Sequence, residues 1–170
     1  MRVLIERAPG AVLGLADVKQ HLRIDGDEFD QQLTWLIDVA IEALESALKT
    51  PLRPSRFRER LRAQSSEVVL QVWGVTEVAS LTVNGQSAAF EHEQHPQGWA
   101  FSGNWAAGDW IEIAYTAGFL VVPKVVLQAL RLEVGTLFEH PERYVDRQAG
   151  QIEFQFLDLA LSALKPEGGF

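Results

Sequence analysis

The pattern of hydrophobic and polar residues predicts a long amphipathic helix near the beginning of the chain, over about Asp27 to Lys49. Apolar residues recur there at helical spacing and share one face of a helix with 3.6 residues per turn; they are Phe29, Leu33, Leu36, Ile37, Ala40, Leu44, Ala47 and Leu48. Pro51 ends this helix, because the residue before a proline is driven out of the α region. A short helix is predicted over Leu15 to Leu22, and residues 1 to 13 are expected to form an extended arm.

A second apolar strip lies on the side of the same long helix, and it consists of Trp35, Val39 and Ile41. One interpretation is that the β part of the subunit covers this strip. The other is a subunit interface, because exposed apolar strips on soluble proteins usually mark contacts with other molecules. The pattern leaves both open.

Residues 55 to 116 show the pattern of several short strands separated by turn residues, which favours a small antiparallel sheet or sandwich. The predicted strands cover residues 56–62, 67–73, 78–83, 87–91, 99–102 and 110–115. Asn84 and Gly85 stand between two of them, and this dipeptide is typical of a type I′ hairpin turn.

The first of these strands carries four arginines on one face, because successive side chains of a strand point to opposite sides. They are Arg56, Arg58, Arg60 and Arg62. Three interpretations stay open for this face: a solvated surface, ion pairs with carboxylates of a neighbouring copy, or contact with DNA phosphates.

A second long helix is predicted from Pro123 to His140, with proline at a favoured first position. Its buried face consists of Val126, Ala129, Leu130, Val134 and Leu137. Gly135 in a helix interior costs about 1 kcal/mol relative to alanine, and we expect it to allow a close approach to the long helix of residues 27–49. A polar link at 144–151 follows, and then a short helix over Phe154 to Leu164 is expected.

Together these elements predict an α+β fold, in which an α-helical bundle carries an inserted small antiparallel β unit. We expect a single domain over residues 1–170. Its predicted parts are N-terminal helices at 14–50, the inserted β unit at 55–116, the main C-terminal helix at 123–140 and a C-terminal segment at 152–170.

Composition narrows the classes of protein that the chain can belong to. The absence of cysteine excludes disulfides and thiolate metal sites. A formal net charge of −8 argues against a surface that holds nucleic acid tightly. The first residues lack the apolar core of a signal peptide, and no apolar run approaches the roughly 20 residues of a membrane span. We therefore expect a soluble protein, made in the cytoplasm and without membrane contact.

The sequence contains few candidate catalytic or metal-binding residues. His92 and His95 have a His-x-x-His spacing, but they fall in a predicted polar loop and lack an evident third metal ligand. No nucleophile elbow and no glycine-rich phosphate loop occur. A hydrolase would therefore need buried, charge-coupled carboxylates beside these histidines. We expect no enzyme activity, no metal and no cofactor.

Tryptophan is concentrated in the β part, at Trp73, Trp99, Trp105 and Trp110. Flat aromatic faces on a small β module can stack on sugar rings, so a carbohydrate-binding module is the alternative function. The other interpretation is that these side chains fill the core of a small sheet. An exposed, coplanar Trp99 and Trp105 would favour the sugar-binding alternative.

Two segments resemble the head–tail connector (adaptor) proteins of long-tailed bacteriophages, which also occur in prophages and gene transfer agents. The first is LADVKQHLRIDGDEFDQQLTWLIDVAIEALESALKTPL, in which Leu15, Lys19, His21, Leu22 and Arg23 stand at the family's L-x-x-x-K-x-H-L-R positions. The second is YTAGFLVVPKVVLQALRLEVGTLFEHPER, with Tyr115 to Phe119, Pro123, Gln128-Ala129 and Glu139 to Arg143 matching. The resemblance covers about 15–50 and 110–144.

The resemblance implies a structural virion protein that forms a ring under the portal at the head–tail junction, after synthesis in the bacterial cytoplasm. Its implied partners are the portal protein, a stopper or tail-completion protein and further copies of itself, with DNA passing through the channel without specific binding. The strip Trp35, Val39 and Ile41 and the arginine face are the candidate subunit contacts, since a ring needs two different surfaces per copy. The C-terminal segment, an apolar stretch, is the candidate portal-docking element or else packs on its own subunit; its residues are Phe154, Phe156, Leu157, Leu159, Leu161 and Phe170.

Overall fold

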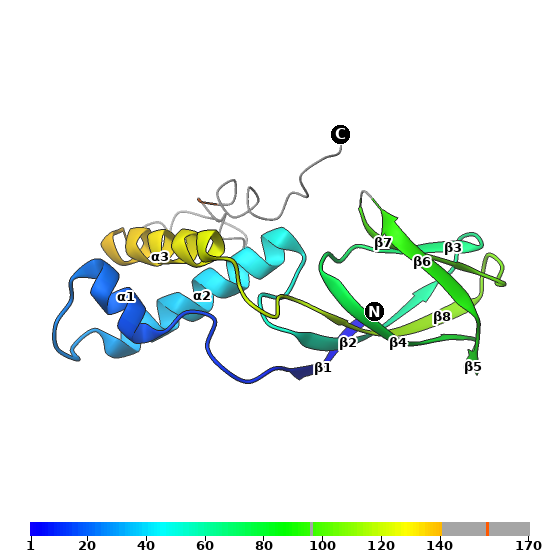
Figure 1. Cartoon of the computed structure of the whole chain (residues 1–170), viewed down its shortest axis with the longest axis horizontal. Helices are drawn as coiled ribbons and strands as arrows, with labels where there is room; N and C mark the ends of the chain where they lie inside the picture. Colours follow the sequence, from blue (N-terminus) through cyan, green and yellow to red (C-terminus); the bar gives the residue numbers. More distant parts are fainter. Residues whose placement is uncertain (96, 141–155, 157–170) are drawn as a thin grey trace. The chain divides into compact units, whose positions relative to one another are not determined.

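The computed structural model describes residues 1–95, 97–140 and 156 of the chain (Figure 1). They divide into two compact units. The β unit consists of Met1–Pro9 and Lys49–Leu120, and the helical unit consists of Gly10–Leu48 and the segment that begins at Val121. The mixed α+β class expected from the sequence is confirmed.

The β unit contains two antiparallel sheets. The first has the order β1-β2-β8-β4-β5, and its strands are β1 (Arg2–Arg7), β2 (Ser55–Arg62), β8 (Trp110–Ala117), β4 (Val75–Val83) and β5 (Gln86–Ser87). The second has the order β3-β7-β6, and its strands are β3 (Glu67–Leu70), β7 (Gly98–Gly103) and β6 (Phe90–His95). Only antiparallel pairs join these described strands.

One hydrophobic core draws its side chains from both sheets. In β8, alternate residues point inward, since the side chains of a strand alternate between its two faces; these are Ile111, Ile113, Tyr115 and Ala117. Leu81 of β4 joins them from the same sheet, and the second sheet contributes Val68, Leu70 and Phe101. The β unit is therefore a small two-layered structure with its own core.

The helical unit contains α1 (Leu15–Leu22), α2 (Asp30–Leu48) and α3 (Lys124–Glu139) within the described residues, and each of these helices contacts the other two. The buried residues of α2 all belong to its predicted apolar face; they are Leu33, Leu36, Ile37, Ala40, Leu44 and Leu48. Every residue of the predicted face of α3 is buried as well. Phe29, just before α2, meets Phe138 of α3 edge to face, with 5.3 Å between ring centroids.

Several details differ from the sequence expectations. The segment with His92 and His95 is strand β6 and not a loop, because its backbone pairs residue by residue with β7. The strand expected over Ser87 to Glu91 is divided between β5 and β6. Gly135 does face a neighbouring helix, but its close neighbour is Leu22 of α1 rather than a residue of α2.

The N-terminal arm is also more ordered than the sequence pattern indicated. Arg2–Arg7 forms β1, which pairs with β2, and a register shift between Leu4 and Glu6 marks a bulge. In the described part of the chain, no helix is long and apolar enough to cross a membrane.

Candidate interaction surfaces

The two histidines of the His-x-x-His spacing lie in different surroundings. The His92 ring stacks near Phe101, with 5.9 Å between ring centroids, and lies 5.5 Å from Trp99. The Nδ1 atom of His95 instead accepts a hydrogen bond from the backbone N–H of Gln97 at 3.1 Å. An i, i+3 spacing on a strand points two side chains to opposite faces, so the pair does not converge on a ligand. Among the described residues, no group of three His, Cys, Asp or Glu side chains could hold a metal ion.

The tryptophans do not form the exposed pair that a sugar-binding platform would need. Trp105 is only 6% exposed, and it packs so closely on Gly103 that a β-carbon there would overlap its ring. Trp99 is half-buried against the core of the β unit. Trp110 is exposed, but the Arg60 guanidinium lies 4.6 Å from the centroid of its ring. These observations favour the interpretation of Trp99 and Trp105 as core residues.

The four arginines of β2 share the outward face of the five-stranded sheet, and all four are exposed. Arg58 Nε lies 3.6 Å from a Glu112 carboxylate oxygen on β8, and Arg56 reaches Glu6 on β1 at 4.0 Å. The Nε–H of Arg62 donates to the Gly108 carbonyl at 3.1 Å. These ion pairs are mostly solvent-exposed, so each contributes little to stability and leaves the guanidinium groups available for another partner.

The second candidate surface lies on α2. Trp35 is 56% exposed, which is high for a large aromatic side chain, whereas Val39 and Ile41 are half-buried. Asp38 and Glu42 are exposed on the same helix, so the apolar contact would have an acidic border. The described parts of the helical unit hold more than twice as many acidic as basic residues, whereas the β unit holds equal numbers. The two candidate surfaces thus differ in charge.

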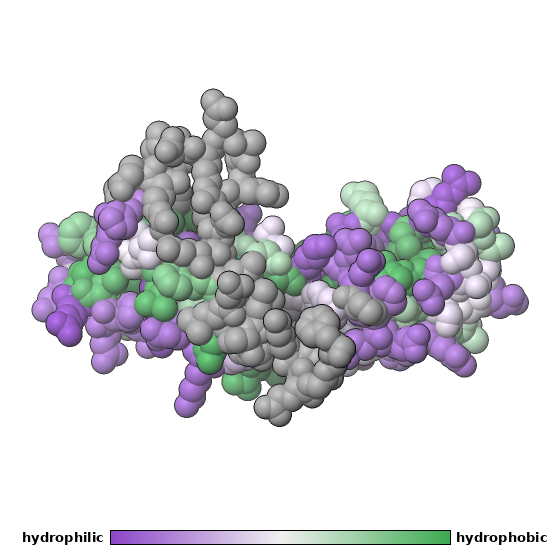
Figure 2. All heavy atoms as spheres, turned by 90° about the horizontal axis from the view of Figure 1, so that it is seen from above, coloured by the Kyte–Doolittle hydropathy of each residue, from purple (hydrophilic) through white to green (hydrophobic). Residues whose placement is uncertain are grey.

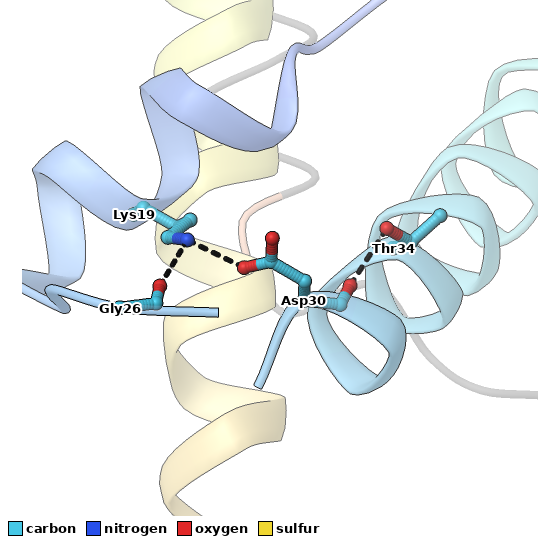
Figure 3. A network of polar contacts seen from close by, with 4 residues as sticks. All are labelled: Lys19, Gly26, Asp30 and Thr34. Atoms are coloured by element: carbon cyan, nitrogen blue, oxygen red, sulfur yellow. Dashed lines mark hydrogen bonds and ion pairs between the residues drawn. The ribbon is translucent and has the colours of Figure 1, made fainter. Parts of the chain in front are cut away.

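Lys19, the lysine of the L-x-x-x-K-x-H-L-R motif, forms hydrogen bonds that stabilise the connection between α1 and α2 (Figure 3). The Nζ atom of Lys19 donates to the Gly26 carbonyl and to Oδ1 of Asp30, the latter at 2.5 Å. Asp30 is the first residue of α2, where a carboxylate is favoured by the helix dipole. Arg23 ends α1 in the left-handed region, with φ of 57°. These motif residues therefore shape a turn between two helices.

The residues of the second motif, at the end of β8, also have structural roles. The Tyr115 hydroxyl donates to a Glu59 carboxylate oxygen at 3.0 Å, and the Arg2 guanidinium lies 4.3 Å from the Phe57 ring centroid beside them. Burial raises the pKa of the Tyr115 hydroxyl well above its usual value; the nearby Arg2 charge opposes this rise and Glu59 adds to it. Gly118 has φ of +119°, and a β-carbon there would overlap the Arg53 carbonyl.

The hairpin tip between β4 and β5 is tied to the turn before β8. Both Asn84 and Gly85 have positive φ, as a type I′ turn requires. The Asn84 side chain donates to Asp109 at 2.8 Å and accepts from the Trp110 backbone N–H at 3.0 Å. The hydrogen bond from the Ala106 backbone N–H and the one from Asn84 lower the pKa of Asp109. This arrangement fixes the turn before β8.

The candidate portal-docking residues lie outside the described residues, with the exception of Phe156, a half-buried turn residue.

The structure also shows one apolar surface that the sequence analysis did not predict, the exposed apolar residues of β1. Val3, Leu4 and Ile5 are 45%, 46% and 48% exposed. The run RVLIER at the N-terminus was the available signal, because an apolar run with β-branched residues is typical of a strand. Figure 2 shows hydrophilic residues spread over both units, with apolar patches interspersed among them.

Comparison with known proteins gives a family match over part of the chain and a shared fold. Residues 13–81 match the family model of the phage gp6-like head-tail connector protein, which confirms the resemblance of the sequence to connector proteins. A chain from the neck of an empty GTA particle computed with C6 symmetry has a TM-score of 0.71 at 22% identity, covering 95% of this chain and 94% of that chain. A chain from the virion of a native gene transfer agent particle has a TM-score of 0.70 at 23% identity, with coverage of 95% and 94%.

A third similar chain comes from the neck of a native GTA particle computed with C12 symmetry, with a TM-score of 0.65, 20% identity and coverage of 100% and 97%. At these identities, the likeness establishes a common fold along nearly the whole chain. No curated protein sequence matches the chain significantly.

Proposed function

We propose that this chain, as a relative of the phage head–tail connector proteins, is a structural subunit of a ring at the head–tail junction of a phage-like particle. The observation that carries the proposal is the combination of the family match over residues 13–81 with a shared fold over nearly the full length of particle neck chains. In this proposal the ring lies under the portal, extends the DNA channel and offers an attachment site to stopper or tail proteins.

The charge of the protein supports passage of DNA rather than its capture. The chain carries a net charge of −8, and its acidic excess is in the helical unit and the segment after residue 140. Tight binding of DNA requires clustered lysine and arginine that displace counterions from the phosphates. An acidic ring repels the phosphates, so DNA passes through the channel without a specific contact.

A ring requires two different, complementary surfaces on each copy. The arginine face of β2 and the strip Trp35, Val39 and Ile41, with its acidic border, are the candidate pair. Their opposite charges favour an oriented contact between the β unit of one copy and α2 of the next. The motif residues Lys19, Tyr115 and Gly118 fit a structural role as well, because each maintains a turn or a buried contact.

Native mass spectrometry and negative-stain imaging of the purified protein, alone and mixed with its portal protein, test the proposed function. The expected result is a closed ring, alone or on the portal. A protein that stays monomeric under both conditions and never binds portal would contradict the proposal. Replacing Arg58 and Arg60 with glutamate, or Asp38 and Glu42 with lysine, is expected to weaken assembly, and combining both sets is expected to restore it.

A further inference from the structure

One edge of the five-stranded sheet is formed by β1, whose one strand partner in the described part of the chain is β2; the strand at the other edge, β5, has only two residues. Natural proteins usually protect such an edge with charges, proline or a covering segment, because its backbone groups can pair with another strand. In β1 the three consecutive residues Val3, Leu4 and Ile5 are apolar and nearly half exposed. An edge of this kind is a natural site for strand addition.

The backbone geometry shows which groups point outward from this edge. Met1 and Arg60 exchange backbone hydrogen bonds in both directions, with the Arg60 N–H donating to the Met1 carbonyl at 2.9 Å. Residues of an antiparallel pair alternate between bonded and non-bonded positions. The N–H and C=O groups of Arg2 and Leu4 therefore point away from β2, toward the open edge.

The strand is also held firmly on its inner side. Arg2 lies over the Phe57 ring and 3.9 Å from Glu59, and beyond the strand the Ala8 N–H donates to the Pro54 carbonyl at 2.8 Å. A fixed edge loses little conformational entropy when another strand pairs with it, which favours binding.

We propose that β1 of one copy pairs with β6 of a second copy, so that sheets of neighbouring copies are joined edge to edge in the ring; this inference rests on the proposed function. In the described residues, β6 and β3 are the two edge strands of the second sheet; β6 has the same length as β1, six residues, and is largely exposed, whereas β3 has only four residues. β6 carries Glu91 and Glu93 and no lysine or arginine, whereas β1 carries Arg2, Glu6 and Arg7, so the two edges have opposite net charge.

Two different edges give each copy a head and a tail for this contact, which is the arrangement that a ring requires. Pairing of β1 with a second β1 would instead produce a two-fold dimer and stop there. The edge-to-edge contact is separate from the arginine face, because side chains of β2 point out of the sheet whereas the backbone groups of β1 point along it.

The chain has no cysteine, so single engineered cysteines test the proposal directly. Leu4→Cys copies are mixed under assembly conditions with His92→Cys or Glu93→Cys copies and treated with a short bis-maleimide cross-linker. The expected product is a covalent dimer that joins the two variants. Ser80→Cys, an exposed position on β4, is the matched control and is expected to cross-link poorly to Leu4→Cys.

A second experiment introduces positive charges on the β1 edge by substitution. The Leu4→Lys/Ile5→Lys variant is expected to keep its thermal stability and to lose at least about tenfold in self-association, since lysines on an edge strand block pairing. Leu120→Lys, which changes an 86% exposed apolar residue away from the strand, is expected to assemble normally.

The outcomes separate the two proposals. Rings that form without a cross-link between positions 4 and 92 or 93, or that tolerate the two lysines, would overturn the edge-pairing inference and leave the proposed function standing. Cross-links between two Leu4→Cys copies alone would indicate a two-fold dimer and also overturn it. A protein that never assembles, alone or with portal, would overturn both.

Discussion

Leu22 of α1 and Gly135 of α3 are in close contact, because a β-carbon built on Gly135 would lie 3.2 Å from Cδ2 of Leu22. The glycine thus permits the two helices to approach at this point. Its use in a helix interior costs about 1 kcal/mol relative to alanine, and the packing of Leu22 offsets that cost.

The Gly135→Val variant is expected to lower the free energy of unfolding by about 1–3 kcal/mol, because the added methyl groups overpack this contact. Urea unfolding followed by circular dichroism measures the change. In a Leu22→Ala background the same substitution should cost less, since the neighbouring side chain has been shortened. An equal cost in both backgrounds would show that the contact with Leu22 does not explain the glycine.

Gly118, in the motif at the end of β8, is expected to be much less tolerant of substitution. Its φ of +119° is unfavourable for any residue with a β-carbon, and that β-carbon would also overlap the Arg53 carbonyl. Gly85 is the matched control, because it has φ of +84° but no atom within 4 Å of the added carbon. Gly85→Ala should cost about 1–2 kcal/mol for the backbone alone, and Gly118→Ala clearly more. Similar thermal stabilities for the two variants would contradict this reading of Gly118.

The Tyr115 hydroxyl makes the stability of the β unit sensitive to alkaline pH. Its pKa is higher in the folded than in the unfolded chain, so only the unfolded chain loses the proton at first. The stabilisation is therefore complete below about pH 10, the usual pKa of tyrosine, and is lost as pH rises further.

Tyr115→Phe removes this titration and should make stability less dependent on pH above about pH 10. The same change removes the donor to Glu59 and should cost about 1–3 kcal/mol at neutral pH. Urea unfolding at a series of alkaline pH values measures both effects. Tyr144→Phe, which changes the other of the two tyrosines, is the control. An unchanged alkaline slope in Tyr115→Phe would refute the assignment.

The Lys19–Asp30 contact is expected to contribute modestly to stability. The two side chains are 21% and 36% exposed, so solvent screens part of their attraction. A double-mutant cycle with Lys19→Met and Asp30→Asn should give a coupling free energy of about 0.5–1 kcal/mol. The coupling should shrink in high salt, as expected for charges that are partly exposed. A coupling of zero at low salt would mean that the contact only shapes the turn.

Truncation of the chain after Asp146 is expected to leave both units folded and to abolish docking to the portal. The removed segment contains the apolar residues predicted to dock, and the buried residues described for the β unit, α2 and α3 all precede it. Circular dichroism and thermal unfolding test the fold, and co-sedimentation with portal tests docking. A truncated chain that fails to fold would show that the segment belongs to the core.

The sequence predicted most of the local structure, because local structure depends on periodicity and on a few residues that stop or start elements. The helix ending before Pro51, the turn at Asn84-Gly85 and the alternating arginines of β2 all follow from such rules. The part of β6 from His92 to His95 was missed because its side chains are all polar, and its strand conformation comes from pairing with β7.

The sequence was less informative about which residues of different helices and strands contact each other. Nothing in the pattern around Gly135 distinguishes Leu22 from a residue of α2 as its neighbour, because all of these helices present aliphatic side chains. The β1 edge was also missed, since exposure of an apolar run depends on which strands lie beside it. The carboxylate partners of the arginine face could not be predicted either. They depend on the register between strands, and Glu6 and Glu112 lie on strands that are far from β2 in the sequence.

The polypeptide enters the β unit, leaves it after Pro9, returns at Lys49 and leaves again after Leu120. Six of the residues in that unit, those of β1, are therefore encoded apart from the other strands. If recombination replaced the gene segment for residues 49 to 120 with that of a relative, the incoming strands would have to pair with the original β1. Viability of such a hybrid would depend on whether the old Arg2 still fits a new Glu59 and Phe57. The fit of β1 to its partner strand would therefore limit the exchange of β units among relatives of this protein.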